Sequence, residues 1–201
     1  MAMRDAIPSV RIWTRELYTH LYKGTNWVHL NIEAQKELDT LLWLIHFCNG
    51  APFTDPVHED EVWIDSSEVG WGLTFKDKMT AKGQFPARVI GTSSTYRELY
   101  GLWSALKDDA VRTRIGGKTL RLNMDSNCSI RNLIKGGGPV RELVKMIKRI
   151  WVECNEIKTK LTPRWQRRNK PMMQEADDLS KTGMRWKVKA SFQQKFRQQL
   201  G

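Results

Sequence analysis

Four acidic residues, Asp65, Glu98, Asp125 and Asp177, have the types and spacing to bind metal ions together. Asp65 and Asp125 each end a short apolar alternation, while Glu98 and Asp177 fall in stretches of helical periodicity. Four carboxylates gathered in one place repel one another and cannot all stay ionised without cations. Two hard divalent ions, Mg²⁺ with Mn²⁺ as a substitute, suit such an all-oxygen set, and such a pair about 4 Å apart stabilises the attacking and leaving oxygens in phosphodiester hydrolysis.

Taken singly, each acid also has an ordinary structural role. Asp65 can make an Asx turn at a strand end, and Glu98 can be a solvated helix residue. Asp125 can cap a helix N-terminus, and Asp177 can interact with a helix dipole. The joint occurrence of all four in this order favours a metal site.

The periodicity predicts the elements that would position these acids. Three strands come first, at 61–66, 70–76 and near 82–90, the last interrupted by Pro86. Ser93 or Ser94 can cap a helix that runs to about residue 111 and carries Glu98. The remaining elements alternate: a strand at 119–125, a short helix through 134, a helix at 140–155, a strand at 157–162 and a helix at 172–181, near whose start Asp177 is expected.

This order predicts an α/β fold in which the first and fourth strands are parallel neighbours. Their carboxyl ends would then bring Asp65 and Asp125 side by side at one edge of the sheet, where open α/β sheets tend to bind ligands.

A helical extension precedes this unit. Helices are predicted at 9–22 and 32–48, and Leu38, Leu41, Leu42, Ile45 and Cys48 would form the apolar stripe of the second. We therefore expect a helical extension at 1–54, an α/β domain at 55–182 and a basic tail at 183–201 with an amphipathic helix at 186–200. The apolar stripes of the extension need burial, so we expect it to pack on the α/β domain.

Composition points to a polyanionic partner. The 201-residue chain has 33 basic and 22 acidic residues, a net charge of +11, so nucleic acid is the favoured partner. Its three cysteines form no C-x-x-C pair, which indicates neither a disulfide framework nor a zinc site. With no long apolar stretch, we expect an intracellular protein, nuclear or cytoplasmic, with no membrane partner.

Four segments together resemble the motifs of a ribonuclease H domain: WIDSSEVGWG, STYRELYGLWSAL, LRLNMDSNCSI and RWQRRNKPMMQEADDLSK. The resemblance is closest to the domains that follow reverse transcriptases in tyrosine-recombinase (DIRS-type) retrotransposons, and it covers roughly residues 31–181. It implies a ribonuclease H-like five-stranded mixed sheet flanked by helices. The helical extension resembles the stretch between polymerase and nuclease in those elements, so a polymerase domain or subunit is an implied partner.

The resemblance implies a function and assigns roles to individual residues. The chain would be an endoribonuclease that cleaves the RNA strand of RNA–DNA hybrids with two Mg²⁺ ions. Asp65, Glu98, Asp125 and Asp177 would hold the metals, Asp65 would bridge both ions, and Asp178 is the fallback for Asp177. Candidate contacts to nucleic acid are Ser66, Ser67, Asn127, Arg167 and Arg168.

Two departures from the family pattern affect this interpretation. Many family members have a histidine before the last helix, but all four histidines here precede the first strand, and Arg167 or Arg168 would stand in that loop. The basic protruding helix of some members is replaced by GGGP, so binding would depend on the basic helix at 140–155, the RWQRRNK loop and the tail. A domesticated, catalytically silent binding or protein-interaction module is the alternative.

Overall fold

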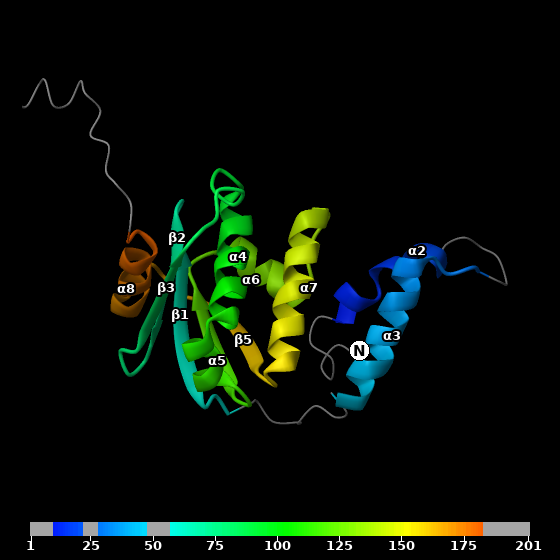
Figure 1. Cartoon of the computed structure of the whole chain (residues 1–201), viewed down its shortest axis with the longest axis horizontal. Coiled ribbons are helices and arrows are strands. Elements are labelled where there is room, and N and C mark those ends of the chain that lie inside the picture. Colours follow the sequence, from blue (N-terminus) through cyan, green and yellow to red (C-terminus); the bar gives the residue numbers. More distant parts are fainter. Residues whose placement is uncertain (1–9, 22–27, 48–56, 183–201) are drawn as a thin grey trace, which may run out of the picture.

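A five-stranded mixed sheet forms the centre of the chain (Figure 1). It is seen in a computed structural model that describes residues 10–21, 28–47 and 57–182. The strands lie in the order β3-β2-β1-β4-β5, with β1 and β2 antiparallel, β2 and β3 antiparallel, and β4 parallel to both β1 and β5. Their bounds are β1 Asp60–Ser66, β2 Gly70–Phe75, β3 Thr80–Gln84, β4 Thr119–Met124 and β5 Lys160–Trp165. The predicted α/β fold, a five-stranded mixed sheet flanked by helices with the first and fourth strands paired in parallel, is confirmed.

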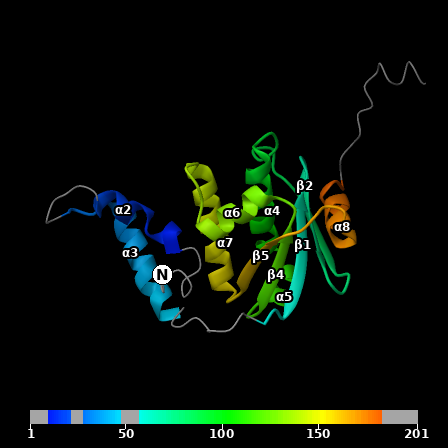
Figure 2. The same ribbon diagram turned by 180° about the vertical axis from the view of Figure 1, so that it is seen from behind.

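Helices cover both faces of this sheet. Two long helices, α4 (Ser94–Lys107) and α7 (Arg141–Glu156), lie side by side over one face, and α8 (Pro171–Ser180) lies on the other (Figures 1 and 2). Two shorter helices, α5 (Asp109–Ile115) and α6 (Asn127–Lys135), complete the layer that contains α4 and α7. The sheet therefore has a helical layer on each side, which leaves the carboxyl ends of β1 and β4 as the edge available for a site.

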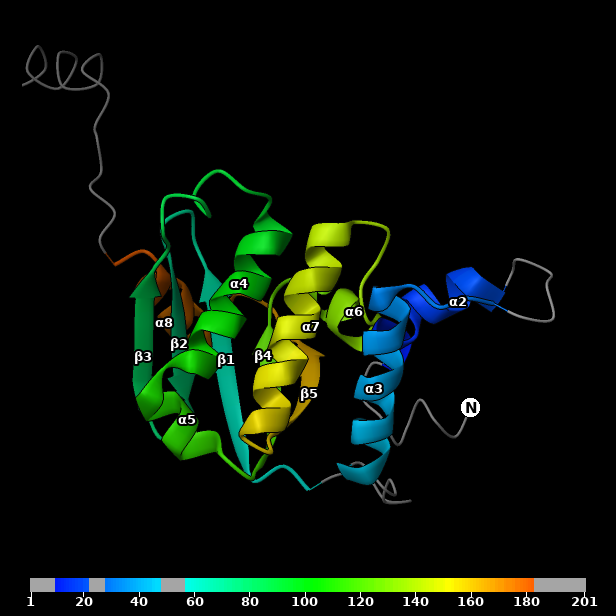
Figure 3. The same ribbon diagram turned by 45° about the vertical axis from the view of Figure 1, so that its right-hand side comes forward.

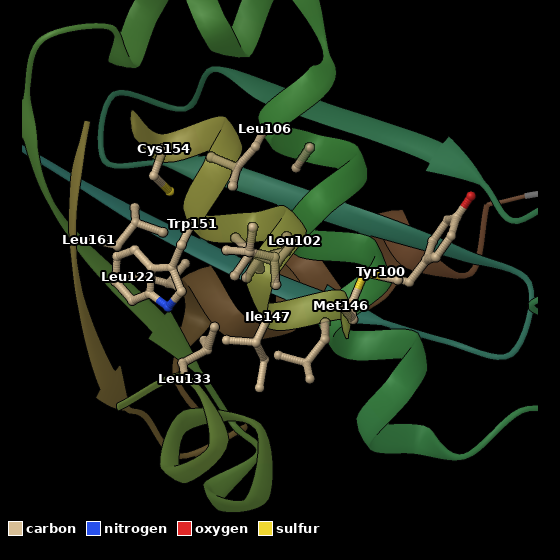
Figure 4. Packing of buried hydrophobic residues seen from close by; sticks show 14 of the residues in the cluster. Tyr100, Leu102, Leu106, Leu122, Leu133, Met146, Ile147, Trp151, Cys154 and Leu161 are labelled. Atoms are coloured by element: carbon tan, nitrogen blue, oxygen red, sulfur yellow. The ribbon is translucent and has the colours of Figure 1, made fainter. Parts of the chain in front are cut away.

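Strand alternation directs one set of side chains into the core. Val62 and Ile64 of β1 are buried against the α4 and α7 layer, where they meet apolar residues from several elements. Figure 4 shows this packing, with labelled side chains from α4, β4, α6, α7 and β5 pointing toward one another. Burial of each large apolar side chain contributes about 1.5–3 kcal/mol, so this cluster is the main source of stability for the sheet. Asp65 belongs to the opposite alternation and faces α8.

The predicted helix from residue 93 to about 111 is wrong in its extent. Ser93 caps α4 as expected, because its side chain accepts a hydrogen bond from Tyr96 N at 3.3 Å. The helix ends at Lys107, however, and Asp108 has extended backbone angles, so its carboxylate accepts from Val111 N at 3.1 Å and caps the separate helix α5. The apolar pattern continues across Asp108 and so predicted one long helix. N-capping by Asp108 ends α4 and begins a second helix at this point.

Two strand predictions need correction. The third strand was expected near 82–90, but β3 ends at Gln84, and residues 86–92 form turns in which Pro86 O accepts from Val89 N at 2.8 Å. The fifth strand was expected at 157–162, whereas β5 runs from Lys160 to Trp165 and includes Pro163. An edge strand tolerates proline where the missing N–H faces away from its partner, so Pro163 does not end β5.

The helical extension packs on α7 and on the loop before it. It consists of the 3₁₀ helix η1 (Val10–Trp13) and the helices α2 (Arg15–Leu21) and α3 (Ile32–Phe47) (Figure 3). Ile12 is fully buried and lies against Gly136, while Arg15 Nη1 donates to Gly138 O at 2.9 Å. The expectation that this extension packs within the chain is therefore confirmed for its described residues.

The buried face of α3 differs from the predicted stripe. Leu38, Leu42 and Ile45 are exposed, and Cys48 lies outside the described residues. Leu41 of the predicted stripe is buried as expected, and the other residues of the buried face are Ala34, Glu37 and Leu44. The buried face of α3 is rotated relative to the prediction. A charged residue, Glu37, lies on that face and bonds to α2 and α7.

Glu37 joins three elements through its carboxylate, although its side chain is only 3% exposed. Its Oε1 accepts from Lys148 Nζ of α7 at 2.8 Å, and its Oε2 accepts from Glu16 N at 2.7 Å and Leu17 N at 3.2 Å. The last two are backbone groups at the start of α2 that have no partner within the helix. A buried charge is tolerated here because all of its bonds are charge-assisted.

The domain boundaries at 54 and 182, and the helix predicted at 186–200, stay predictions, since residues 48–56 and 183–201 lie outside the described part. Within the described residues, none of the helices has both the length and the apolar character needed to cross a membrane.

Candidate active site

Asp65 lies next to last in β1 and is buried, with its side chain 4% exposed. The parallel pairing of β1 with β4 sets Val62 opposite Leu122 and Trp63 opposite Asn123. The same register carried on by two residues sets Asp125 level with Asp65, directly after the last residue of β4. The sheet thus brings the two acids together at its carboxyl edge, as predicted.

Asp125 is engaged by the arginine of the loop before α8. The Nε and Nη2 atoms of Arg168 both lie 2.7 Å from Asp125 Oδ2, and Nη2 lies 4.0 Å from Asp65 Oδ2. On the backbone side, Asp125 O accepts from Trp165 Nε1 at 2.9 Å. Of the two arginines considered for this loop, Arg168 is therefore the one that points into the acidic cluster.

Glu98 comes from the second turn of α4 and faces the same edge. Burial raises the pKa of Glu98, and the charge of Asp125 acts in the same direction. The side chains of Ser126 and Ser129, at the start of α6, oppose this shift. One oxygen, Glu98 Oε2, is buried without a hydrogen-bond partner. A buried carboxylate oxygen without a donor is a natural ligand for a cation.

Asp177 completes the group from the opposite face of the sheet. It is the seventh residue of α8 (Pro171–Ser180), so the expectation that it stands near the helix start is wrong. Asp65 and Asp177 share a hydrogen bond, and Lys181 Nζ, one turn further along, pairs with Asp177 Oδ2. Asp178 is exposed, so the geometry selects Asp177 rather than Asp178 as the partner of Asp65.

The pKa values of Asp65 and Asp177 are shifted in opposite directions. Burial, reinforced by the neighbouring charge of Asp125, raises the pKa of Asp65 to about 7, against the opposing hydrogen bond from Ser66 N. Burial also acts to raise the pKa of Asp177, but the hydrogen bonds from Lys181 and Asp65 outweigh it and lower that pKa. The neutral form of Asp65 is thus favoured by burial and by its acidic neighbours, and a bound cation would favour the ionised form instead.

The chemistry of these donors fits hard divalent ions, although their present placement does not form a finished site. Among the described residues, no group of three or more His, Cys, Asp or Glu side chains is positioned to hold a metal as it stands. Two of the acids instead have cationic partners: Arg168 pairs with Asp125, and Lys181 pairs with Asp177. Both cations have partly exposed side chains, which can turn into solvent.

The candidate nucleic-acid contacts fall into two groups. Asn127 and Arg167 are exposed, and each is close in sequence to a residue of the acidic cluster, Asp125 or its partner Arg168; their contact to nucleic acid stays a prediction. For Ser66 and Ser67 the contact to nucleic acid stays a prediction, and the structure shows where their hydroxyls lie. Ser66 Oγ is buried and lies close to Gly101 of α4. A Cβ added at Gly101 would lie only 2.3 Å from this oxygen. Ser67 Oγ donates to Ser180 O at 2.7 Å and ties the β1–β2 turn to the end of α8.

Two positioning residues were missed by the motif analysis. Lys181 pairs with Asp177, and the i,i+4 spacing of the two on one helix was a usable signal. Arg97 precedes Glu98 and donates from Nε to Ser67 O at 3.1 Å and from Nη1 to Thr92 O. It holds the turn that follows Asp65, and its two backbone acceptors are apparent only from the tertiary structure.

Comparisons with known proteins identify similar folds at low identity. No family model matches the chain, and no curated protein matches it. Three solved structures are similar. The first is the N-terminal ribonuclease H domain of a Mycobacterium tuberculosis protein fused to maltose binding protein, with 16% identity, 62% of this chain and 99% of that chain covered, and a TM-score of 0.46.

The second is a ribonuclease H1 from the archaeon Halobacterium salinarum, with 15% identity, 60% and 92% coverage and a TM-score of 0.45. The third is LC11 ribonuclease H1 in complex with an RNA/DNA hybrid, with 16% identity, 60% and 93% coverage and a TM-score of 0.48. Similarities at these TM-scores do not indicate a function for this chain.

Proposed function

We propose that this chain is a metal-dependent endoribonuclease that cleaves the RNA strand of RNA–DNA hybrids. The observation that supports it most strongly is the meeting of Asp65, Glu98, Asp125 and Asp177, from four separate elements, at the carboxyl edge of β1 and β4. The influence of Asp125 on the pKa of both Asp65 and Glu98, and of Asp177 on that of Asp65, supports the proposal that the four carboxylates act together.

In this proposal each residue has a defined task. Asp65 and Asp125 would hold both divalent ions from the sheet, while Glu98 and Asp177 would close the set from α4 and α8. The ions would supply activation of the attacking water and stabilisation of the leaving oxygen. Asp65 would give up its proton on loading, and Arg97 would keep the turn after it in place.

Substrate binding would rely on the basic surface around the acids. Arg167 and Asn127 are exposed and close in sequence to residues of the cluster, and Arg141 and Lys145 are exposed on α7. Lys148 is less available than its place on the basic helix predicted, because it pairs with Glu37. Contacts to phosphates and to the 2′-hydroxyl would distinguish a hybrid from DNA. The motif resemblance supports, as part of this proposal, a retrotransposon origin and a polymerase domain as the protein partner.

The test is cleavage by the full chain in Mg²⁺, with either strand of a hybrid end-labelled and with single-stranded RNA, duplex RNA and duplex DNA as controls. We expect products from the RNA strand of the hybrid alone, no products in EDTA, and recovery in Mn²⁺. Cleavage that is equal on duplex DNA would contradict the substrate assignment.

A catalytically silent binding module is the second candidate, and one observation favours it. Arg168 and Lys181 already neutralise Asp125 and Asp177, so the cluster can exist without metal. Tight, salt-dependent binding of the hybrid without cleavage in Mg²⁺ or Mn²⁺ would select this candidate. Binding that does not change with salt would instead indicate a surface for protein partners.

A further inference from the structure

Arg168 occupies the centre of the acidic cluster. Two of its nitrogens lie 2.7 Å from Asp125 Oδ2, and one lies 4.0 Å from Asp65 Oδ2. Its charge also acts on Asp177 and on Glu98. Among the described residues, no other cationic side chain forms an ion pair with Asp65 or Asp125. A single guanidinium thus pairs with the acids at the ends of β1 and β4, while Asp177 has its own partner in Lys181.

The contact with Asp125 is of a kind that competes with a metal ion. Two nitrogens of Arg168 lie at the same oxygen, Oδ2: Nε donates a hydrogen bond to one of its lone pairs, and Nη2 forms an ion pair with it at the same distance. A divalent ion bound to that oxygen needs the same lone pairs, and its charge repels the guanidinium at short range. The two cations therefore cannot occupy Asp125 Oδ2 together.

The same side chain is easy to displace. Arg168 is 64% exposed, so only its head group is held and its stem can turn into solvent. It stands in the loop between β5 and α8, where Arg167 O accepts from Lys170 N at 3.2 Å and keeps the backbone turn independent of the side chain. Exposed ion pairs are weak individually, which suits a partner that must leave.

We infer that Arg168 is a built-in counter-cation for Asp125 and Asp65 in the metal-free chain, and that a divalent ion must displace it from Asp125. The inference rests on the proposed function only for what the ion does next. Arg168 is then a positioning residue, and it sets the concentration of divalent ion at which the acidic cluster binds metal. The structure assigns this role to Arg168 and not to Arg167, its neighbour in the same loop.

The test measures metal binding directly, without nucleic acid. Calorimetric titration of the full chain with Mg²⁺, and separately with Ca²⁺, is compared for wild type, Arg168→Ala, Arg168→Lys and the matched control Arg167→Ala. We expect Arg168→Ala to bind both ions roughly three- to tenfold more tightly, because the competing cation is gone. Arg168→Lys should bind with an affinity between those of wild type and Arg168→Ala, and Arg167→Ala should match wild type.

Thermal unfolding in EDTA provides the second measurement. Arg168→Ala should melt at a lower temperature than wild type and than Arg167→Ala, since Asp125 and Asp65 lose the cation that pairs with them, and saturating Mg²⁺ should remove that difference. Unchanged or weaker metal binding by Arg168→Ala, or no metal binding by either protein, would overturn the inference.

These outcomes are separable from those of the cleavage assay. If Arg168→Ala binds Mg²⁺ more tightly while neither protein cleaves a hybrid, the inference stands and the proposed nuclease function fails. If wild type cleaves the hybrid and Arg168→Ala shows unaltered metal affinity, the nuclease function stands and the inference fails.

Discussion

Gly72 lies directly opposite Asp65 in the antiparallel pair of β1 and β2. Side chains of directly opposed residues share a face, so a side chain at Gly72 would point, like Asp65, toward α8. A Cβ at Gly72 would lie 2.4 Å from Ala176 O and 2.6 Å from Ser180 N. The absence of a side chain at Gly72 is what allows α8 to approach the sheet closely enough to bring Asp177 to Asp65.

Replacing Gly72 with alanine should therefore separate α8 from β2. We expect Gly72→Ala to lose about 1–3 kcal/mol of unfolding free energy, because the clash is with backbone atoms that cannot rotate away. Cleavage of hybrid should fall with it, since Asp177 moves with α8. Chemical denaturation and the cleavage assay measure the two effects.

Gly138→Ala is the matched control, because a Cβ there meets its nearest neighbour, Asn132 Oδ1, at an ordinary 3.4 Å. An unchanged stability and activity for Gly72→Ala would show that α8 is not held by this contact.

The stability of the metal-free protein should depend on pH through Asp65. Its pKa is about 7 in the folded chain and 3.8 as an ordinary value, so between these pH values the folded state holds a proton that the unfolded state releases. The free energy of unfolding should fall as pH rises from about 4 to about 7, by on the order of a few kcal/mol, and this group should add no further slope above that range. Burial also raises the pKa of Glu98, which adds a slope of the same sign.

Asp65→Asn should flatten much of that slope and raise the melting temperature in EDTA at pH 8, since it removes a buried charge. Denaturation at a series of pH values, with EDTA throughout, provides the comparison. A wild-type stability that rises between pH 4 and pH 7 would contradict the raised pKa.

The two adjacent aspartates of α8 should differ sharply in their effect on cleavage. Asp177→Asn should reduce the rate by more than the roughly 10- to 100-fold typical of groups that only support a metal ligand. Asp178→Asn should leave it within a few-fold, because Asp178 is exposed. Steady-state rates at saturating Mg²⁺ test this, and equal losses in the two variants would reject the choice of Asp177.

The attachment of the helical extension should depend on Glu37. Glu37→Ala leaves the N-terminal amides of α2 without their acceptor and removes the partner of Lys148, so we expect a loss of about 3 kcal/mol of unfolding free energy. Glu33→Ala on the same helix removes an exposed pair with Lys36 and should cost at most about 0.5 kcal/mol. Similar small losses in both variants would mean that the extension is not fastened through this carboxylate.

Much of the fold followed from the sequence because local signals and topology agreed. Asp65 and Asp125 end short apolar alternations, and parallel strands bring such ends to one edge, so their meeting could be predicted without coordinates. Glu98 was placed correctly because Ser93 is a recognisable cap for α4.

Other features could not be predicted because tertiary contacts overrode the local pattern. The apolar pattern of α3 favoured a stripe through Leu38 and Leu42, but the bonds made by Glu37 turn the helix to bury a carboxylate instead. Pro163 resembled a loop residue and lies within an edge strand. No periodicity indicates that Arg168, rather than Arg167, reaches Asp125, since that depends on the direction of one side chain in a loop.

The proposed metal site is tested most directly by a crystal structure of the full chain soaked with Mn²⁺. Anomalous peaks should lie about 2.1 Å from carboxylate oxygens of Asp65 and Asp125, with Glu98 and Asp177 also coordinated and Arg168 turned away from Asp125. Soaked crystals of Asp65→Asn should lack these peaks. Crystals that take up Mn²⁺ elsewhere while Arg168 stays on Asp125 would contradict the assignment of these four acids as the metal ligands.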